Sequence, residues 1–425
     1  MKSCIIHINK LGPIENQVIE LAPVMFFTGE SNLGKSYVNF LAYYVYKVFS
    51  SDRLFDFLLS KITQDAITAK DFSFKIDTKE IIAWMSNDVR KFFAYLYNYD
   101  EIPCDVEFEF ENVEDSFEIQ YKEQHRDNNE NDYFAFEVII NKLSSITITS
   151  EQRIEKAICR NIVRQLCQVF MGGRYMRTLL LPPGRASLLT GDFTAQRGSS
   201  RLGLYDTFLQ DNDWIDSRAL RNGRKGDAND FIVSQIHSLI KGDLISEKEG
   251  LYLQTENGKK IPLGATASSI KELTPLLQWI LGGEIKNYSV CIEEPEAHLH
   301  PEMQIAVADL LASCINQNVA MQITTHSDYF LQRVNQLLKY GIIRERDFLC
   351  YERLCKETGH KPEHFLDKNI INAYYFSSDK GNTVIEPLNV GENGIPLSTF
   401  FDAVKALSLE DEMLDEELEK LNLHA

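Results

Sequence analysis

The chain has 425 residues, of which 44% are hydrophobic and 25% are charged. These fractions exclude a disordered or fibrous chain, and the length predicts two or three domains, or one domain that carries a large insertion. Because 44 Lys and Arg oppose 62 Asp and Glu, the formal charge is −18, which argues against a protein that binds nucleic acid over its whole surface but leaves a local basic groove open.

The first 50 residues predict three short strands, a glycine-rich loop and a helix. Residues 3–28 contain apolar segments separated by Gly12-Pro13 and Pro23, and apolar residues recur at helical spacing from Lys35 to about Ser50. A match to the pattern GxxxxGK[ST] lies between the third strand and the helix. It consists of Gly29, Glu30, Ser31, Asn32, Leu33, Gly34, Lys35 and Ser36.

This loop predicts a site for ATP and Mg²⁺ in the amino-terminal lobe, residues 1–50. Its backbone N–H groups and the helix amino terminus would hold phosphate oxygens. Lys35 would reach the β and γ phosphates, and the Ser36 hydroxyl would bind Mg²⁺. The flanking strand and helix disfavour the alternative, a glycine turn with an incidental lysine.

Residues 51–150 predict an acidic inserted lid region. Helical segments come first, and alternating strands at 106–110 and 117–121 then predict an antiparallel hairpin with one solvated face. The region has 10 basic and 21 acidic residues, a net charge of −11. It therefore holds most of the excess negative charge.

Residues 151–395 alternate between helices and strands. A helix near 150–171 and a strand at 178–181 precede the Pro182-Pro183-Gly184 break, and long loops are expected between 190 and 230. A hairpin near 243–264, a helix at 268–281, a strand at 289–292, a helix at 302–316 and a strand at 320–324 follow. This order predicts an α/β fold. Residues 396–425 form an acidic tail with an amphipathic helix at Leu409–Leu421.

Two carboxylates follow the strand at 289–292. A nucleotide-hydrolysing site needs an acidic residue for the metal and a base for the attacking water, both near the end of a strand. Glu293 is the candidate for the Mg²⁺ shell, and Glu294 is the candidate base if the turn before Pro295 brings its side chain round. The alternative is a solvated acidic turn.

The sequence continues with Glu296-Ala297-His298-Leu299-His300-Pro301 and, later, Thr324-Thr325-His326-Ser327. Together these motifs resemble the ABC-type ATPases of the overcoming-lysogenization-defect and RecF/SMC-like group, including ATPase subunits associated with the PARIS, Septu and retron anti-phage systems. The resemblance covers about residues 1–50 and 175–395. It implies an ABC-type P-loop ATPase head with a mixed sheet and an inserted α+β lid. It also implies that Glu296–His300 form the D-loop and that His326 contacts the γ-phosphate.

Heads of this group close ATP between two subunits, so the resemblance implies a homo-oligomer with a serine-led signature acting in trans. Ser268 and Ser269 stand at that place, although Ile270 follows them where related heads commonly have glycine. The alternative is an ordinary serine N-cap. Ser31 also departs from the asparagine that is common in these loops, and Gln196 is a candidate for the Q-loop.

Two further groups of residues suggest metal chemistry. Cys350, Cys355, His360 and His364 follow the spacing C-x4-C-x4-H-x3-H, which is too short between its pairs for a zinc finger, and Cys350 reads as a core residue of a strand at 348–351. His298 and His300 have the HxH spacing of metal ligands, but the resemblance disfavours that role because it places them in the D-loop. Asp211 and Asp213 form the pair that a nuclease would use, but loop caps explain them more simply, and no Asp-x-Asp occurs after residue 330.

The cysteines and the apolar pattern predict a cytoplasmic protein. The eight cysteines are scattered along the chain and not clustered as in a disulfide scaffold. The amino terminus is apolar for only a few residues, and no run of about 18 apolar residues occurs. We therefore expect neither secretion nor a membrane span.

The predicted function is an ATP-hydrolysing sensor or scaffold of an anti-phage system, with the toxic activity on a separate effector chain from a neighbouring gene. The runner-up is a RecF-like DNA-repair ATPase whose segment 151–225, with 13 basic and 7 acidic residues, contacts DNA. The third hypothesis is a nuclease that uses the Asp211 region.

Overall fold

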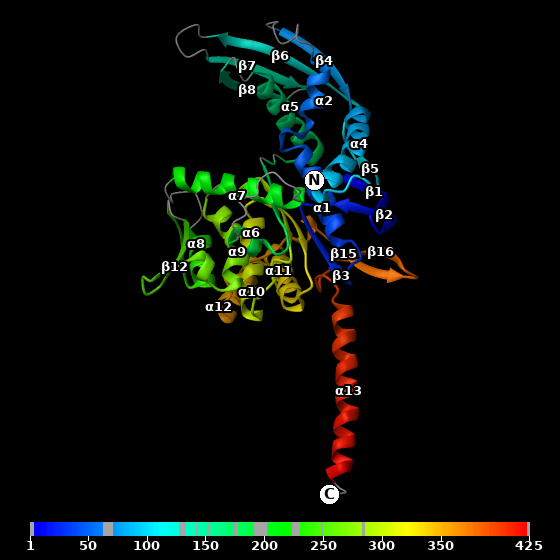
Figure 1. The fold of residues 1–425 in the computed structure, drawn as a ribbon, viewed down its shortest axis with the longest axis vertical. Coiled ribbons are helices and arrows are strands. Elements are labelled where there is room, and N and C mark those ends of the chain that lie inside the picture. The colour runs from blue at the N-terminus through cyan, green and yellow to red at the C-terminus, as the bar shows by residue number, and fades with distance from the viewer. Residues whose placement is uncertain are drawn as a thin grey trace.

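The computed structural model is built around a nine-stranded mixed sheet (Figure 1). It describes residues 4–62, 71–126, 133–141, 143–150, 154–173, 175, 177–190, 202–222, 230–247, 250–282 and 285–422. In spatial order the strands are β5 (Cys104–Phe110), β1 (Cys4–Leu11), β2 (Ile14–Leu21), β16 (Asn382–Leu388), β15 (Ile371–Asp379), β3 (Val24–Gly29), β14 (Ala320–Thr324), β13 (Tyr288–Glu293) and β9 (Arg177–Leu181).

One half of this sheet is parallel. Strands β15, β3, β14, β13 and β9 pair in parallel, so their carboxyl ends lie along one edge. Their side chains enter two hydrophobic clusters, one on each face: in β3, Met25 and Phe27 belong to one and Val24 and Phe26 to the other. Strands that are buried on both faces need helices on both sides of the sheet. The α/β fold with a mixed sheet that the sequence predicts is confirmed.

Helices cover both faces of the parallel half. Helix α1 (Lys35–Val48) packs on β13 and β14. The other helices and short elements of this part are α6 (Arg185–Thr190), α7 (Gly203–Asn222), α8 (Asp230–Ile240), η4 (Leu263–Ala265), α9 (Ser268–Leu281), α10 (Pro301–Ile315), α11 (Asp328–Arg346), α12 (Phe348–Thr358) and η5 (Lys368–Ile370). A small sheet of β10 (Gly242–Glu247), β11 (Gly250–Thr255) and β12 (Lys260–Pro262) precedes α9.

A second, four-stranded antiparallel sheet lies in the inserted region, at the top of Figure 1. Its strands are β4 (Asp71–Asp77), β6 (Ser116–Arg126), β7 (Tyr133–Ile140) and β8 (Leu143–Ser150). The accompanying helices are η1 (Asp52–Leu54), α2 (Phe55–Lys61), α4 (Thr78–Tyr97) and α5 (Ile154–Met171).

The predicted hairpin between 106–110 and 117–121 is wrong. Strand β5 pairs with β1 at the edge of the main sheet, whereas β6 pairs with β4 and β7. The alternation itself is present, since Val106, Phe108 and Phe110 are buried and the residues between them are exposed. Alternation tells which face of a strand is solvated but not which strand lies beside it.

Two local expectations between and after these elements also fail. Residues 203–222 form helix α7, with Leu204 and Phe208 buried one turn apart, where long loops were expected; 191–201 and 223–229 lie outside the described residues. Cys350 lies in helix α12 and not in a strand, because Asp347 caps that helix by accepting the Cys350 N–H at 2.9 Å.

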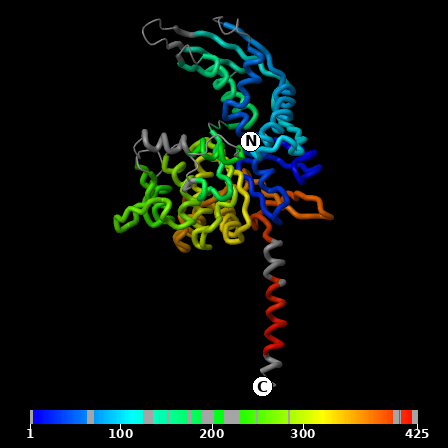
Figure 2. The backbone as a smooth tube through the Cα atoms, viewed as in Figure 1, coloured from blue at the N-terminus to red at the C-terminus, as the bar shows by residue number. Residues whose placement is uncertain are grey.

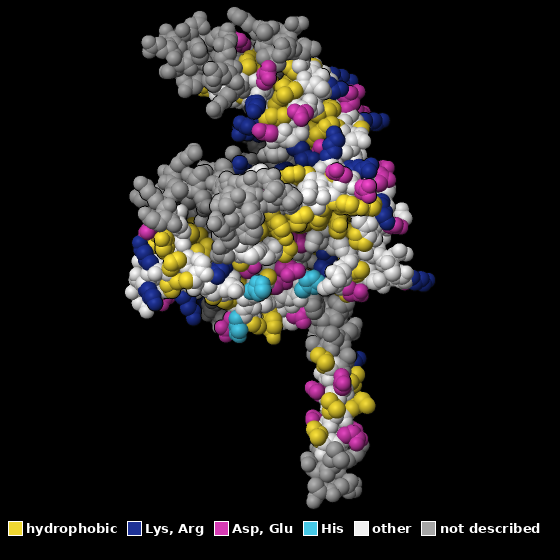
Figure 3. All heavy atoms as spheres, viewed as in Figure 1, with side chains coloured by type: hydrophobic (Ala, Val, Ile, Leu, Met, Phe, Trp, Pro, Cys, Tyr) yellow, Lys and Arg dark blue, Asp and Glu magenta, His cyan; other side chains and the backbone are white. Residues whose placement is uncertain are grey.

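The tail forms helix α13 (Ser398–Asn422), which runs away from the sheet on the side opposite to the insertion (Figures 1 and 2). Acidic and apolar side chains lie beside one another along its described part (Figure 3). Among the residues that the structure describes, no helix combines the length and apolar character that crossing a membrane requires.

Candidate active site

The glycine-rich loop joins the end of β3 to the start of α1. Gly29 has φ 118°, and a Cβ atom there would lie 2.2 Å from the Phe376 carbonyl oxygen on β15. The Glu30 N–H donates to that same oxygen at 2.9 Å. Asn32 and Gly34 have φ values of 62° and 88°, in the left-handed region that Gly and Asn tolerate best. The loop is therefore tightly curled and held against β15 where it begins.

Lys35, the first residue of α1, reaches back across this loop. Its Nζ donates to the Gly29 carbonyl oxygen at 3.2 Å and to the Glu30 carbonyl oxygen. Burial lowers the pKa of the Lys35 ammonium, while Glu293 and Glu294 act in the opposite direction. The cation is thus held among the loop carbonyls and near both candidate carboxylates.

Glu293 ends strand β13 and is buried. The Ser36 hydroxyl donates to its Oε2 atom, and Asn39 Nδ2 donates to Oε1 at 2.5 Å. Burial raises the pKa of the Glu293 carboxyl, and the bonds from Ser36 and Asn39 partly offset this. A carboxylate and a hydroxyl side by side are the hard oxygen ligands that Mg²⁺ takes, so the donor set fits this ion.

None of the sequence motifs includes Asn39. This residue lies three positions after Ser36, so both side chains share one face of α1 and meet Glu293 together. The available signal was an amide within the apolar run Val38–Val45, where an unpaired polar side chain would be unfavourable.

Glu294 leaves the strand with φ 46°. Its N–H donates to the Thr324 carbonyl oxygen at 3.1 Å and lies 3.3 Å from the Thr324 Oγ1 atom. The left-handed turn interrupts the alternation of the strand, and the half-buried Glu294 side chain is close enough to Lys35 to act on its pKa.

Glu296 connects this strand end to the loop after β14. One of its carboxylate oxygens, Oε1, accepts the Thr325 hydroxyl at 2.7 Å and the His326 N–H at 2.8 Å. Burial and Lys35 lower the pKa of His326, while Glu294 raises it. Lys35, Glu294 and His326 thus form one electrostatic group at the carboxyl ends of β3, β13 and β14.

Ser268 and Ser269 occupy the first turn of α9. Neither caps the helix: the N-cap residue is Ala267, and no side chain forms a capping bond. The Ser268 side chain is exposed and Ser269 is half-buried. The alternative of a serine N-cap is therefore wrong.

The residues suggested for nuclease chemistry are placed differently. Asp211 on α7 accepts the Leu180 N–H of β9 at 3.3 Å, and burial raises the pKa of its carboxyl to about 6 against the lowering effect of Lys47. The Asp211 carboxylate therefore holds the backbone of β9 in place. The Asp213 side chain and the whole of Gln196 lie outside the described residues.

The histidines of the Cys350–His364 group have protein partners. His360 Nε2 pairs with the His364 carbonyl oxygen at 2.6 Å, and Arg333 lies 3.2 Å from its Nδ1 atom. Where the structure describes the chain, no three His, Cys, Asp or Glu side chains form a group suited to a metal ion. His298 and His300 are exposed.

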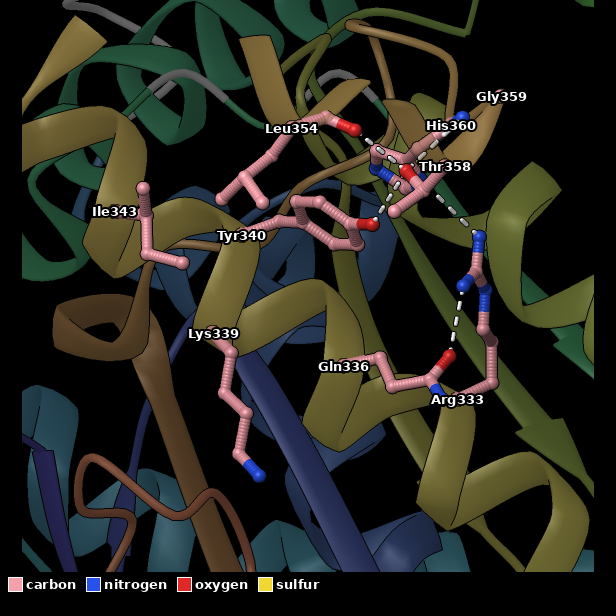
Figure 4. Close-up of a pocket in the computed structure, with 9 residues that line it drawn as sticks. All are labelled: Arg333, Gln336, Lys339, Tyr340, Ile343, Leu354, Thr358, Gly359 and His360. Atoms are coloured by element: carbon pink, nitrogen blue, oxygen red, sulfur yellow. Dashed lines mark hydrogen bonds between the residues drawn. The ribbon is translucent and has the colours of Figure 1, made fainter. Parts of the chain in front are cut away.

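Beside this group lies a cavity of about 550 Å³, shown in Figure 4. Its lining comes from α11, α12 and the turn after α12. The ring of Tyr340 stacks on that of His360, with centroids 3.6 Å apart. The cavity is distinct from the loop at Gly29–Ser36.

One family model matches a part of the chain that includes residues of this site. Residues 219–331 match the model of the AAA ATPase domain, a stretch that includes α9, Glu293, Glu294 and His326 but not the glycine-rich loop. No curated protein matches the chain.

Three solved structures show a distant likeness. A structure of an SmcHead bound to the C-winged helix domain of ScpA is 11% identical, with 92% of this chain and 98% of that chain covered and a TM-score of 0.37. The SMC head domain from Thermotoga maritima is 10% identical, with 92% and 100% covered and a TM-score of 0.33. The Pyrococcus furiosus Smc head with an extended coiled coil, bound to the C-terminal domain of ScpA, is 13% identical, with 97% and 100% covered and a TM-score of 0.34.

The matched segment and the loop at Gly29–Ser36 converge at the carboxyl edge of the parallel strands, where open α/β sheets bind ligands. Together they indicate an ATPase of the P-loop type.

Proposed function

We propose that the chain binds ATP with Mg²⁺ at the Gly29–Ser36 loop and hydrolyses it with Glu294 as the base that polarises water. The observation that carries this proposal is that Ser36 contacts Glu293 while Lys35 and His326 lie near Glu294, all at the carboxyl ends of the parallel strands. Ser36 and Glu293 would hold Mg²⁺, which when bound neutralises charge on the phosphates.

Each residue has a distinct task in this proposal. Lys35 binds the β and γ phosphates, and the loop N–H groups orient them. Glu294 accepts a proton from the attacking water, while His326 contacts the γ-phosphate. Asn39 keeps the Glu293 carboxylate aimed at the Ser36 hydroxyl.

Glu294→Gln tests the assignment. The amide keeps the size of the side chain but cannot accept the proton, so turnover should fall at least about tenfold while ATP is still bound. Lys35→Ala serves as the contrasting variant and should lose ATP binding. Unchanged hydrolysis in Glu294→Gln would sink the assignment.

We further propose that the chain is the ATPase subunit of an anti-phage system. The support is the resemblance carried by Glu293–Pro301 and Thr324–Ser327. The test is expression with its neighbouring genes in phage-challenged bacteria, measured as plaque formation. Protection that survives Lys35→Ala would count against an ATP-dependent role.

A separate effector chain is proposed to bind the acidic surfaces. Seven acidic residues and one lysine lie between Leu409 and Leu421. Apolar side chains of α13 are exposed among them: Leu407 by 64%, Leu409 by 53%, Met413 by 70%, Leu414 by 55% and Leu418 by 57%. Like charges would oppose a paired copy of this helix, so a basic partner with an apolar groove fits better.

The purified chain should therefore show ATPase activity without nuclease activity, and a neighbouring-gene product should co-purify with it in a salt-sensitive manner. Capture lost in Leu414→Asp would assign the contact to α13, and capture retained would leave the −11 insertion as the binding surface. DNA cleavage by the isolated chain that disappears in Asp211→Ala would favour the nuclease hypothesis. Salt-sensitive DNA binding without a protein partner would favour the RecF-like one.

A further inference from the structure

Arg185 is a charged residue with an almost fully buried side chain. It follows the Pro182-Pro183-Gly184 break after β9, begins α6, and is only 1% exposed. A buried guanidinium is unfavourable unless its donors are satisfied, so its partners indicate why it is there.

The partners of Arg185 lie on three separate elements. Its Nε donates to the Glu272 carbonyl oxygen on α9 at 2.8 Å and lies 3.5 Å from that residue's carboxylate. Its Nη1 donates to the Glu293 carbonyl oxygen at 2.8 Å and to the Pro182 carbonyl oxygen at 3.2 Å, and Nη2 lies 3.5 Å from the Glu294 carbonyl oxygen. One rigid planar group therefore joins α9 to the end of β13.

The residues at both ends of this connection matter for the proposed reaction. Glu272 lies four positions after Ser268, so the two residues share one face of α9. At the other end, Glu294 is held in a left-handed conformation that is unfavourable for a non-glycine residue. Hydrogen bonds to the carbonyl groups of Glu293 and Glu294 fix the backbone from which both carboxylates project.

The positive charge of Arg185 lies close to the carboxylates at the end of β13. Glu272, Glu296, Glu293 and Glu294 all interact electrostatically with the guanidinium. These four carboxylates offset the unfavourable burial of the cation, so the guanidinium and the strand end stabilise one another.

We propose that Arg185 is a positioning residue that couples the serine-bearing helix α9 to the Glu293–Glu294 strand end. A displacement of α9, when its first turn meets the γ-phosphate of a second subunit, would be transmitted through the guanidinium to the base and the metal ligand. This inference rests on the proposed function and adds the residue through which closure would control hydrolysis.

Two substitutions separate geometry from charge. Arg185→Lys keeps the positive charge but cannot span the three elements, so kcat should fall about tenfold. Arg185→Gln removes the charge as well, so kcat should fall further than in Arg185→Lys. ATP affinity should stay within about threefold in both, because the Lys35 loop is intact.

A control comes from a second arginine–carboxylate pair, which is only partly buried. Arg53 Nε contacts the Asp88 carboxylate at 2.5 Å in the inserted region, with side-chain exposures of 21% and 14%. Arg53→Gln should lower the thermal midpoint without a change in kcat. If Arg185→Gln fails to fold, Arg185→Lys and Glu272→Gln carry the test, and a double-mutant cycle between them should be non-additive in kcat.

The outcomes distinguish this inference from the proposed function. A wild-type kcat in Arg185→Lys, together with slow turnover in Glu294→Gln, would overturn the coupling role alone. Normal turnover in Glu294→Gln would overturn the proposed function itself. Loss of thermal stability in Arg185→Lys with unchanged kcat would reduce Arg185 to a structural residue.

Discussion

Gly29 allows a quantitative prediction, because two independent effects oppose any side chain there. In Gly29→Ala the new Cβ would lie 2.2 Å from the Phe376 carbonyl oxygen and 2.6 Å from its nitrogen. Both atoms are backbone, so β3 and β15 must separate, and the bond from the Glu30 N–H to that oxygen is lost. The lost bond costs about 1 kcal/mol, and the φ value of 118° adds roughly 1–3 kcal/mol for alanine.

We therefore expect Gly29→Ala to lower the free energy of unfolding by about 2–4 kcal/mol. The assay is urea denaturation, with the midpoint and slope compared with those of the wild type. ATP affinity should also fall at least about tenfold, because the loop that holds the phosphates begins at this residue.

Gly381→Ala is the control. This glycine also has a positive φ, of 86°, but a Cβ there would have no atom within 4 Å. It should show only the backbone strain, about 1–2 kcal/mol, and unchanged ATP affinity. Equal effects of the two substitutions on unfolding, with normal ATP binding in Gly29→Ala, would refute the role of the Phe376 contact.

Two further predictions concern assembly and pH. Ser268→Arg should block closure over ATP without unfolding the chain, and mixing it with Lys35→Ala should restore ATPase activity if the serines act in trans; a mixture as inactive as either variant would count against shared sites. Burial raises the pKa of folded Glu293 above its unfolded value, so the folded chain binds more protons and this residue's contribution to stability falls as pH rises through that pKa. Glu293→Gln should therefore flatten the loss of stability as pH rises above the ordinary range of a glutamate, measured by urea denaturation without Mg²⁺, and an unchanged pH dependence would contradict the assigned cause.

Local sequence determined the parts of this protein that depend on neighbouring residues. Gly29 and Gly34 permit backbone angles that other residues avoid, and the alternation of strands and helices around them produced the confirmed α/β fold. Glu293 and Glu294 follow an apolar segment, so their position at the end of a strand could be predicted from the sequence as well.

The tertiary structure decided which distant segments meet. Strand β5 joins β1 because its buried face completes the main core, which no local alternation specifies. Asn39 lies 254 residues from Glu293 in the sequence and donates to its buried carboxylate. Arg185 lies 108 residues from Glu293 and donates to its carbonyl group at the strand end. A buried polar group without a hydrogen-bond partner is unfavourable, so the need for these two side chains arises from their buried surroundings. The spacing of residues in the sequence does not reveal that need.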